Sequence, residues 1–301
     1  MGKRDDESIR EAVRERYGRI AKSGEKTQGS LPMASCCDFT AMPSGKGAVF
    51  DCCGSSEATA ESSKGASCCA PADFPVEKIA QVLGYREGDL KSDVGEVNMG
   101  LGCGNPVAIA SLKPGETVVD LGAGGGFDCF LASKEVGTGG KVIGVDMTPD
   151  MVTKARKNAE KVGSDNVEFR LGEIEHLPVA DGSADIIMSN CVINLSPDKR
   201  AVYRDAFRVL KGGGRLAIAD VLATRPLPDE IRNDLNLIGA CVGGAETVDE
   251  TRKILEETGF QDIKIIDHHK SEEMLSQWVP EEGKRAGSYV VSAYVEAIKP
   301  A

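Results

Sequence analysis

From residue 117 onward, short apolar runs alternate with segments whose apolar residues recur at helical spacing. The apolar runs lack strict alternation, as expected of strands that are buried on both faces of a sheet. They lie at 117–122, 141–147, 167–171, 184–190 and 215–221. The helical patterns between them lie at 127–136, 149–162 and 199–210. Repeated strand–helix–strand units predict a parallel sheet with helices on both faces.

Further elements are expected on either side of this region. Toward the C-terminus, the pattern predicts a helix at 248–258 and two more strands at 262–268 and 289–298. Toward the N-terminus, it predicts helices at 5–22, 75–83 and 106–112. Together these elements predict an α/β fold built on a doubly wound seven-stranded sheet of the Rossmann-like type.

Residues 24–75 differ in composition from the rest of the chain. Gly, Ser and Ala occupy 22 of these 52 positions, so the segment can bury little apolar surface and is expected to be flexible. It contains three adjacent cysteine pairs, each beginning 16 residues after the previous one: Cys36-Cys37, Cys52-Cys53 and Cys68-Cys69. We therefore divide the chain into an N-terminal helix with the cysteine-pair segment (1–75), a core (76–225) and a small C-terminal extension that completes the sheet (226–301).

Charge and cysteine content narrow the possible partners. The formal net charge of −11 makes the chain a poor non-specific ligand of nucleic acid or of an anionic membrane. The sequence has no run of 18 apolar residues and no apolar stretch near its start, so we expect neither a transmembrane helix nor a secretory signal, and a cytoplasmic location. Nothing in the sequence requires more than a monomer. In such a chain, 10 cysteines indicate thiols that bind a ligand or change redox state, rather than structural disulfides.

A glycine-rich loop follows the first strand of the alternating region. Its glycines, Gly122, Gly124 and Gly126, let the backbone turn tightly and approach a ligand closely. Their spacing differs from the G-x-G-x-x-G pattern of dinucleotide sites and resembles that of an S-adenosylmethionine site. This ligand has no pyrophosphate, but its amine requires a carboxylate, which Asp120 provides just before the loop.

Positions after the next strands complete the predicted cofactor site. Asp146 ends the second strand, where a carboxylate accepts hydrogen bonds from both ribose hydroxyls. The residues that follow the third strand are placed to contact the adenine. The predicted cofactor-binding residues are Asp120, Gly122, Ala123, Gly124, Gly126, Asp146, Met147, Gly172, Glu173, Ile174 and Asn190.

Three cysteines of the globular part lie in loops where a ligand is expected. Cys191 follows the fourth strand, and Cys103 and Cys241 are each flanked by glycines, which permit close approach. Because ligands of open α/β sheets bind beyond the carboxyl ends of the strands, these thiols could converge on one soft, thiophilic centre. The alternative for each is a thiol buried in the core, which is the interpretation we favour for Cys129.

The motifs around these residues resemble those of the arsenite S-adenosylmethionine methyltransferases, which are class I methyltransferases. The resemblance covers roughly 76–270 and rests on Asn-Cys-Val-Ile-Asn-Leu at 190–195, Gly-Val-Asp-Met-Thr-Pro at 144–149 and Cys-Val-Gly-Gly-Ala at 241–245. It implies methyl transfer from S-adenosylmethionine to arsenite, or to its glutathione conjugate, as detoxification.

The same resemblance implies roles for individual cysteines. Cys103, Cys191 and Cys241 correspond to the family's As(III) ligands. The family also uses a more N-terminal cysteine, which forms a disulfide during turnover that thioredoxin or glutathione reduces. Six cysteines compete for that role here, and Cys68 and Cys69 are the candidates because they are nearest to Cys103 in the chain.

Two other functions stay open at this point. A methyltransferase of an organic small molecule would need the cofactor site but not the three cysteines together. A non-catalytic thiol protein that sequesters a metal or metalloid would need the cysteines but no cofactor pocket. The cysteine pairs themselves fit either a redox relay or a tail that delivers arsenic.

Overall fold

The computed structural model describes residues 6–23, 76–267 and 288–301. Its centre is a seven-stranded sheet in the order β3-β2-β1-β4-β5-β7-β6. The strands are β1 (Thr117–Leu121), β2 (Lys141–Asp146), β3 (Val167–Leu171), β4 (Ala184–Asn190), β5 (Leu210–Ala223), β6 (Gln261–Asp267) and β7 (Val290–Ile298). The predicted α/β class and strand number are confirmed. Strand β7 runs antiparallel to both of its neighbours, β5 and β6, so the sheet is mixed.

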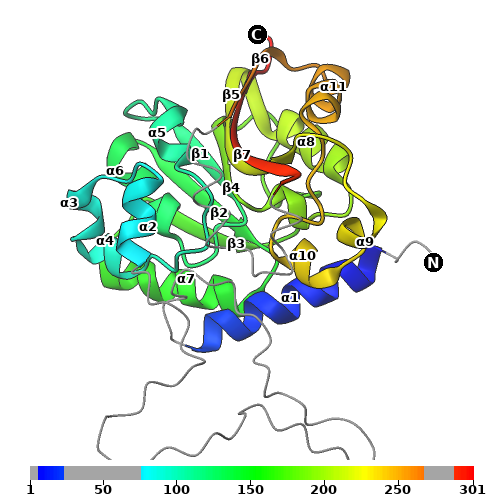
Figure 1. Cartoon of the computed structure of the whole chain (residues 1–301). Coiled ribbons are helices and arrows are strands. Elements are labelled where there is room, and N and C mark those ends of the chain that lie inside the picture. The colour runs from blue at the N-terminus through cyan, green and yellow to red at the C-terminus, as the bar shows by residue number, and fades with distance from the viewer. Residues whose placement is uncertain (1–5, 24–75, 268–287) are drawn as a thin grey trace, which may run out of the picture.

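Helices cover both faces of the sheet, and each face has its own apolar core (Figure 1). One face carries α5 (Pro106–Ala110), α6 (Phe127–Val136) and α7 (Pro149–Val162), and the other carries α8 (Lys199–Val209) and α11 (Val248–Thr258). Successive residues of β1, Val118 and Val119, belong to different cores and are both fully buried. This two-sided burial explains the continuous apolar runs in the sequence.

Several short elements surround this framework. They are α2 (Val76–Val82), α3 (Glu87–Leu90), α4 (Asp93–Glu96), the 3-10 helix η1 (Ile193–Leu195), α9 (Asp229–Arg232) and α10 (Leu235–Gly239). Only α2 corresponds to a predicted helix. The others span about one turn, which is too short for a helical period to be visible in the sequence.

Two boundaries differ from those predicted. Strand β5 begins at Leu210 rather than 215, because Leu210 already pairs with Ala184 and the pairing continues after a register shift. The helix expected at 106–112 ends at Ala110, because Ser111 takes a left-handed φ of 48°. The predicted cysteine-pair segment at 24–75, including Cys68 and Cys69, lies outside the described residues.

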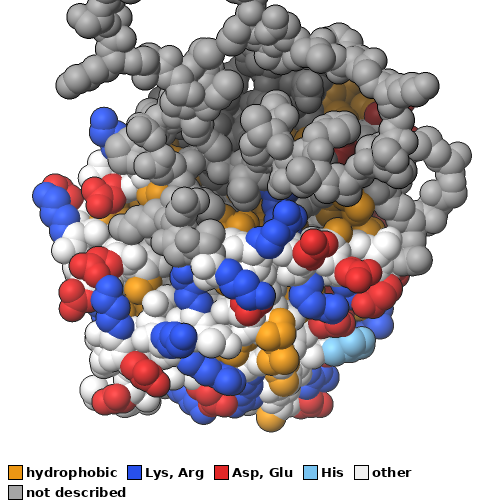
Figure 2. All heavy atoms as spheres, turned by 90° about the horizontal axis from the view of Figure 1, so that it is seen from below, with side chains coloured by type: hydrophobic (Ala, Val, Ile, Leu, Met, Phe, Trp, Pro, Cys, Tyr) orange, Lys and Arg blue, Asp and Glu red, His pale blue; other side chains and the backbone are white. Residues whose placement is uncertain are grey.

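The N-terminal helix, α1 (Asp6–Ser23), packs against α7, α10 and η1, which are far away in the sequence (Figure 1). Val13 and Ile20, two of its predicted apolar positions, are buried. Lys22 forms an ion pair with Asp150 of α7 at 3.0 Å. Figure 2 shows the molecule from below, with basic and acidic side chains interspersed over this face. Within the described ranges, no helix combines the length and the hydrophobicity needed to cross a membrane.

Candidate functional site

A cavity lies at the carboxyl ends of the central strands and is bordered by α1 and α2. Its empty volume is about 1210 Å³, including the space at its mouth. The segment 97–102 and the loops after β1, β2, β3 and β4 contribute to its wall. Of the residues predicted to bind a cofactor, those that line it are Asp120, Gly122, Ala123, Gly124, Asp146, Met147, Ile174 and Asn190.

Asp146 ends β2 and organises the loops on either side of the cavity. Its Oδ2 accepts a hydrogen bond from the N–H of Gly124 at 3.0 Å, and its Oδ1 accepts one from the N–H of Thr148 at 2.8 Å. Burial raises the pKa of Asp146, while these backbone N–H groups lower it. Each carboxylate oxygen keeps a second lone pair, so the group can also accept hydrogen bonds from a pair of ligand hydroxyls.

Two further buried carboxylates, Asp120 and Asp128, line the same cavity. Burial raises the pKa of both, and the charge of Asp128 raises that of Asp120 further. Within the described part of the chain, no Lys or Arg forms an ion pair with either. The Cys129 thiol donates to Asp120 Oδ2 at 3.1 Å. A cationic ligand would compensate these carboxylates, so the donor set fits the ammonium and sulfonium groups of S-adenosylmethionine.

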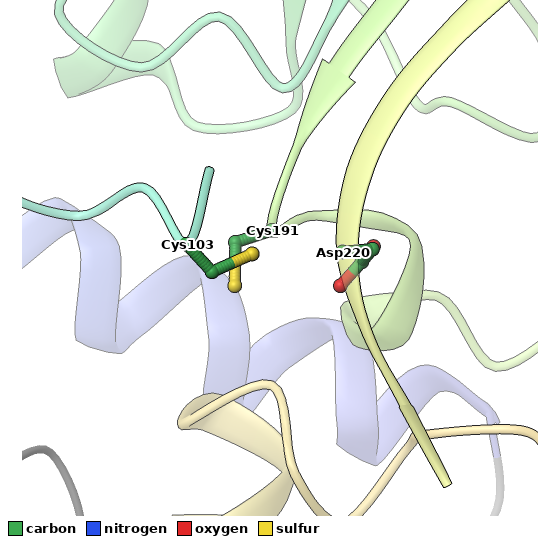
Figure 3. Close-up of side chains that lie close together, drawn as sticks. All are labelled: Cys103, Cys191 and Asp220. Atoms are coloured by element: carbon green, nitrogen blue, oxygen red, sulfur yellow. The ribbon is translucent and has the colours of Figure 1, made fainter. Parts of the chain in front are cut away.

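Cys103 and Cys191 meet next to this cavity, although they come from separate segments of the chain (Figure 3). Their Sγ atoms and a carboxylate oxygen of Asp220 all lie within 4.8 Å of one another, and all three side chains are buried. The Cys241 thiol donates to the carbonyl oxygen of Cys191 at 2.7 Å. All four cysteines of the described ranges are free and buried. Cys103, Cys191 and Cys241 lie together and are called the thiol group below.

The backbone at two of these cysteines has an unusual conformation. Cys191 and Cys241 have φ angles of +58° and +61°, in the left-handed region that costs about 1 to 2 kcal/mol for a residue with a side chain. The N–H of Cys191 donates to the carbonyl oxygen of Ala219 at 2.8 Å, which holds the turn in place. Strain of this kind persists where the surroundings over-determine it, and it is concentrated at functional sites.

The thiols of this group are protonated at neutral pH. Burial raises the pKa of Cys103 to about 11. Burial and the neighbouring Cys103 thiol raise the pKa of Cys191 well above its ordinary value. The hydrogen bond with the Cys191 thiol, followed by burial, does the same to the pKa of Cys241. The group therefore presents neutral thiols rather than thiolates to an incoming ligand.

Most of the other predicted residues that the structure describes lie outside the cavity wall. Of the three thiols, only Cys191 lines the cavity, and Cys103 and Cys241 lie behind it. Gly126, Gly172 and Glu173 are not part of the lining. Gly126 is the N-cap of α6, Gly172 packs against Pro178, and Glu173 forms ion pairs with Arg10 and Arg14 of α1.

Several lining residues were missed in the sequence. Arg10, Val13 and Tyr17 reach the cavity from α1. Glu175, one of the residues predicted after the third strand, also lines it. The Arg10 Nη2 lies 3.4 Å from Glu175 Oε1, which ties α1 to the loop after β3. The amphipathic pattern of α1 showed that the helix has a buried face, but no local signal shows what covers that face.

Comparison with known proteins shows similarity to methyltransferases over nearly the whole chain. A family model described as a methyltransferase domain matches residues 112–259. The arsenite methyltransferase of Halobacterium salinarum is 46% identical over 298 residues, which make up 99% of this chain and 68% of that protein. The human arsenite methyltransferase is 45% identical over 158 residues, which make up 50% of this chain and 42% of the human protein.

A solved structure shows the same similarity in three dimensions. The arsenic(III) S-adenosylmethionine methyltransferase of Chlamydomonas reinhardtii superposes with a TM-score of 0.57 at 32% identity, covering 75% of this chain and 74% of that one. The similarity to the Halobacterium protein extends over nearly the whole chain. This chain therefore belongs to the arsenite methyltransferase family.

Proposed function

We propose that the protein transfers methyl groups from S-adenosylmethionine to trivalent arsenic held by the thiols of Cys103, Cys191 and Cys241. One observation carries the proposal: Cys191 belongs both to a buried thiol group and to the wall of a cavity that contains buried carboxylates. The similarity to proteins named arsenite methyltransferases supports arsenic as the acceptor.

The thiol group determines how the acceptor is presented. Arsenic(III) is a soft centre that prefers thiolate sulfur, and three sulfur ligands form a pyramid that leaves the arsenic lone pair free. Because Cys191 lines the cavity, arsenic bound to this group lies beside the cavity, where its lone pair can face the methyl donor. Orientation is the main catalytic contribution, and no strong general base is needed because the nucleophile is a lone pair.

The carboxylates of the cavity hold the methyl donor. When bound, S-adenosylmethionine supplies an electrophilic methyl group on its sulfonium. Asp120 binds the ammonium group, Asp146 accepts hydrogen bonds from the ribose hydroxyls, and Ile174 contacts the adenine. The glycine loop that starts at Gly122 leaves room for the amino-acid tail.

Turnover also requires electrons. Methyl transfer by the lone pair leaves arsenic formally pentavalent, and its return to the trivalent state takes two electrons. Two protein thiols supply these electrons by forming a disulfide. Cys68 and Cys69 are the candidates for the N-terminal cysteine of this disulfide. Thioredoxin or glutathione then restores the thiols by exchange.

Labelled methyl transfer tests this function directly. The protein is incubated with arsenite, methyl-labelled S-adenosylmethionine and either thioredoxin with its reductase or glutathione. We expect label in methylated arsenic, with more than one turnover only when a reductant is present. Cofactor binding without transfer to arsenite would contradict the proposed acceptor and point to an organic one, whereas no cofactor binding would favour a sequestering protein.

Replacement of Asp146 by alanine tests the cofactor site. Loss of hydrogen bonds from two ribose hydroxyls to a buried carboxylate is expected to raise the Kd of S-adenosylmethionine about 10- to 100-fold. Asp150→Ala is the matched control, because Asp150 lies four positions later, forms an ion pair with Lys22 and does not line the cavity. Equal cofactor affinities of the two variants in a calorimetric titration would argue against this role of Asp146.

The raised pKa values of the thiols predict how arsenite affinity varies with pH. Because Cys103, with a pKa of about 11, and its neighbours are protonated at neutral pH, each thiol proton leaves with one hydroxide of As(OH)₃ as water. The exchange neither takes up nor releases protons, so the equilibrium affinity should be flat between about pH 6.5 and 8. If the ligands were thiolates, each hydroxide would need a proton from solution to leave as water, and the affinity would fall with rising pH. Equilibrium dialysis across this range distinguishes the two cases.

A further inference from the structure

Two asparagines on either side of Cys191, Asn190 and Asn194, each connect the Cys191 segment to the loop of another thiol. Both belong to the same short run at 190–195. Asn194 is 3% exposed, and the Asn190 amide also lies among protein groups. Their hydrogen bonds connect the three segments that carry the thiols.

Asn190 holds the loop of Cys103. Its Oδ1 accepts hydrogen bonds from the N–H groups of Cys103 at 3.0 Å and Gly104 at 3.3 Å, while its Nδ2 donates to the Gly104 carbonyl oxygen at 3.0 Å. A side chain at Gly102 would prevent this contact, since its Cβ would lie 2.5 Å from Asn190 Nδ2. The amide therefore binds both the donors and an acceptor of the Cys103 loop.

The orientation of the Asn190 amide is determined by its other neighbours. Nδ2 lies 2.9 Å from Asp128 Oδ2 and 3.0 Å from the Tyr85 hydroxyl, and this hydroxyl donates to Asp128 Oδ1 at 2.7 Å. The acceptors all lie on the nitrogen side of the amide and the donors on its oxygen side. These contacts fix the orientation of the Asn190 amide, which also lines the cavity.

Asn194 holds the loop of Cys241 in the same way. Its Nδ2 lies 3.0 Å from the carbonyl oxygen of Cys241, 2.5 Å from that of Val221 and 3.0 Å from Asp220 Oδ1, and these three acceptors share its two N–H groups. Asp220 Oδ2 in turn accepts from the N–H of Ile193 at 2.9 Å. The Cys191 and Cys241 segments are thus joined through one buried amide, which the buried Asp220 carboxylate also contacts.

We propose that Asn190 and Asn194 are positioning residues that hold the thiols of Cys103 and Cys241 within reach of the one arsenic atom bound by Cys191. The inference rests on the proposed function of this site. Three-coordinate binding of one arsenic atom requires that all three sulfur atoms stay close together. The left-handed backbone at Cys191 and Cys241 makes this arrangement energetically costly. The hydrogen bonds of the two amides hold the Cys103 and Cys241 loops against the Cys191 segment.

The test compares Asn190→Ala and Asn194→Ala with Asn166→Ala. Asn166 is a matched control, because its amide also bridges several chain groups, accepting from Ser133 Oγ at 2.6 Å and donating to the carbonyl oxygen of Gly137 at 2.9 Å. It lies next to the start of β2, at the opposite end of the strand from the cavity. Thermal unfolding of all three variants shows how much stability each amide contributes.

Arsenic binding is then measured by equilibrium dialysis and by X-ray absorption at the arsenic edge. Asn190→Ala and Asn194→Ala are each expected to raise the Kd of arsenite about 10- to 100-fold and to lower the number of bound sulfur atoms from three to two. Asn166→Ala should keep the parental Kd and three sulfur atoms. Parental affinity and three sulfur atoms in the Asn190 and Asn194 variants would overturn the proposal, as would equal losses in all three variants.

Double-mutant cycles show through which thiol each asparagine acts. Asn190→Ala should add less than about a twofold loss in a Cys103→Ser background, but its full loss in a Cys241→Ser background. Asn194→Ala should show the reverse pattern. Equal losses of arsenite affinity in both backgrounds would mean that the amides do not act through these thiols.

A dithiol reagent separates this proposal from the proposed function. Phenylarsine oxide binds two close thiols and requires no methyl transfer. One outcome is that the parent protein binds phenylarsine oxide, that the asparagine variants bind it more weakly, and that arsenite is not methylated. The positioning role is then supported and the proposed function is contradicted. If the parent binds neither arsenic compound, both are overturned.

Discussion

Replacement of Cys191 by serine is expected to lower the rate of arsenite methylation by about a thousandfold or more, while the Kd of S-adenosylmethionine changes by less than about threefold. Cys191 is the thiol that lines the cavity, and its sulfur lies within 4.8 Å of that of Cys103. The Cys241 thiol donates to the carbonyl oxygen of Cys191. Serine oxygen is a hard ligand that water readily displaces from arsenic. The variant therefore loses the arsenic ligand that lies at the cavity wall.

Cys129→Ser provides the matched comparison, because it makes the same substitution at another fully buried thiol. Its hydroxyl can still donate to Asp120, and we expect arsenite affinity to stay at the parental value. Single-turnover transfer of labelled methyl groups, measured beside cofactor binding, separates the two sites. A Cys191→Ser protein that methylates arsenite at more than about a tenth of the parental rate would contradict the proposed ligand set.

Replacement of Gly244 by alanine is expected to raise the Kd of arsenite about 100-fold through backbone displacement alone. A Cβ at this position would lie 1.9 Å from the carbonyl oxygen of Asn194, which is a backbone atom and cannot rotate away. The Cys241 loop must therefore move away from the Cys191 segment. Overpacking of this kind costs about 1 to 3 kcal/mol of stability as well, so the melting temperature should also fall.

Gly88→Ala is the control for this substitution. A Cβ at Gly88 has no atom within 4 Å, and the residue lies in α3, where alanine is favoured over glycine. Its arsenite affinity should equal that of the parent. Gly244→Ala protein with parental arsenite affinity and a lowered melting temperature would show that the spacing of the two segments does not determine arsenic binding.

The sheet and the cofactor loop were predictable because their signals are local. The strands show uninterrupted apolar runs, and the glycines of the loop stand directly between a strand and a helix. Asp146 was recognisable because the end of the second strand fixes its place beside that loop, where its carboxylate bonds Gly124. The antiparallel direction of β7 was not predicted, because the apolar pattern of a nine-residue strand does not distinguish parallel from antiparallel pairing.

The environment of the thiols was not predictable in the same way. Cys103 and Cys241 stood out by their glycine neighbours, but their approach to Cys191 depends on contacts between residues that are 50 or more positions apart. Asp220 looked like an ordinary polar residue inside a strand, and only the fold brings it beside two sulfur atoms. Asn194 belongs to the motif at 190–195, but its role was not visible in the sequence because its three acceptors come from other segments.

X-ray absorption at the arsenic edge tests most directly whether one arsenic atom is bound by these three thiols. The sample is the arsenite-loaded protein in which Cys36, Cys37, Cys52, Cys53, Cys68 and Cys69 are replaced by serine, so that Cys129 is the only other thiol left. The proposed site predicts three sulfur ligands, and two after a further Cys103→Ser or Cys241→Ser substitution. Arsenic coordinated mainly by oxygen in the six-serine protein would contradict the site, because the N-terminal cysteines would then be the ligands.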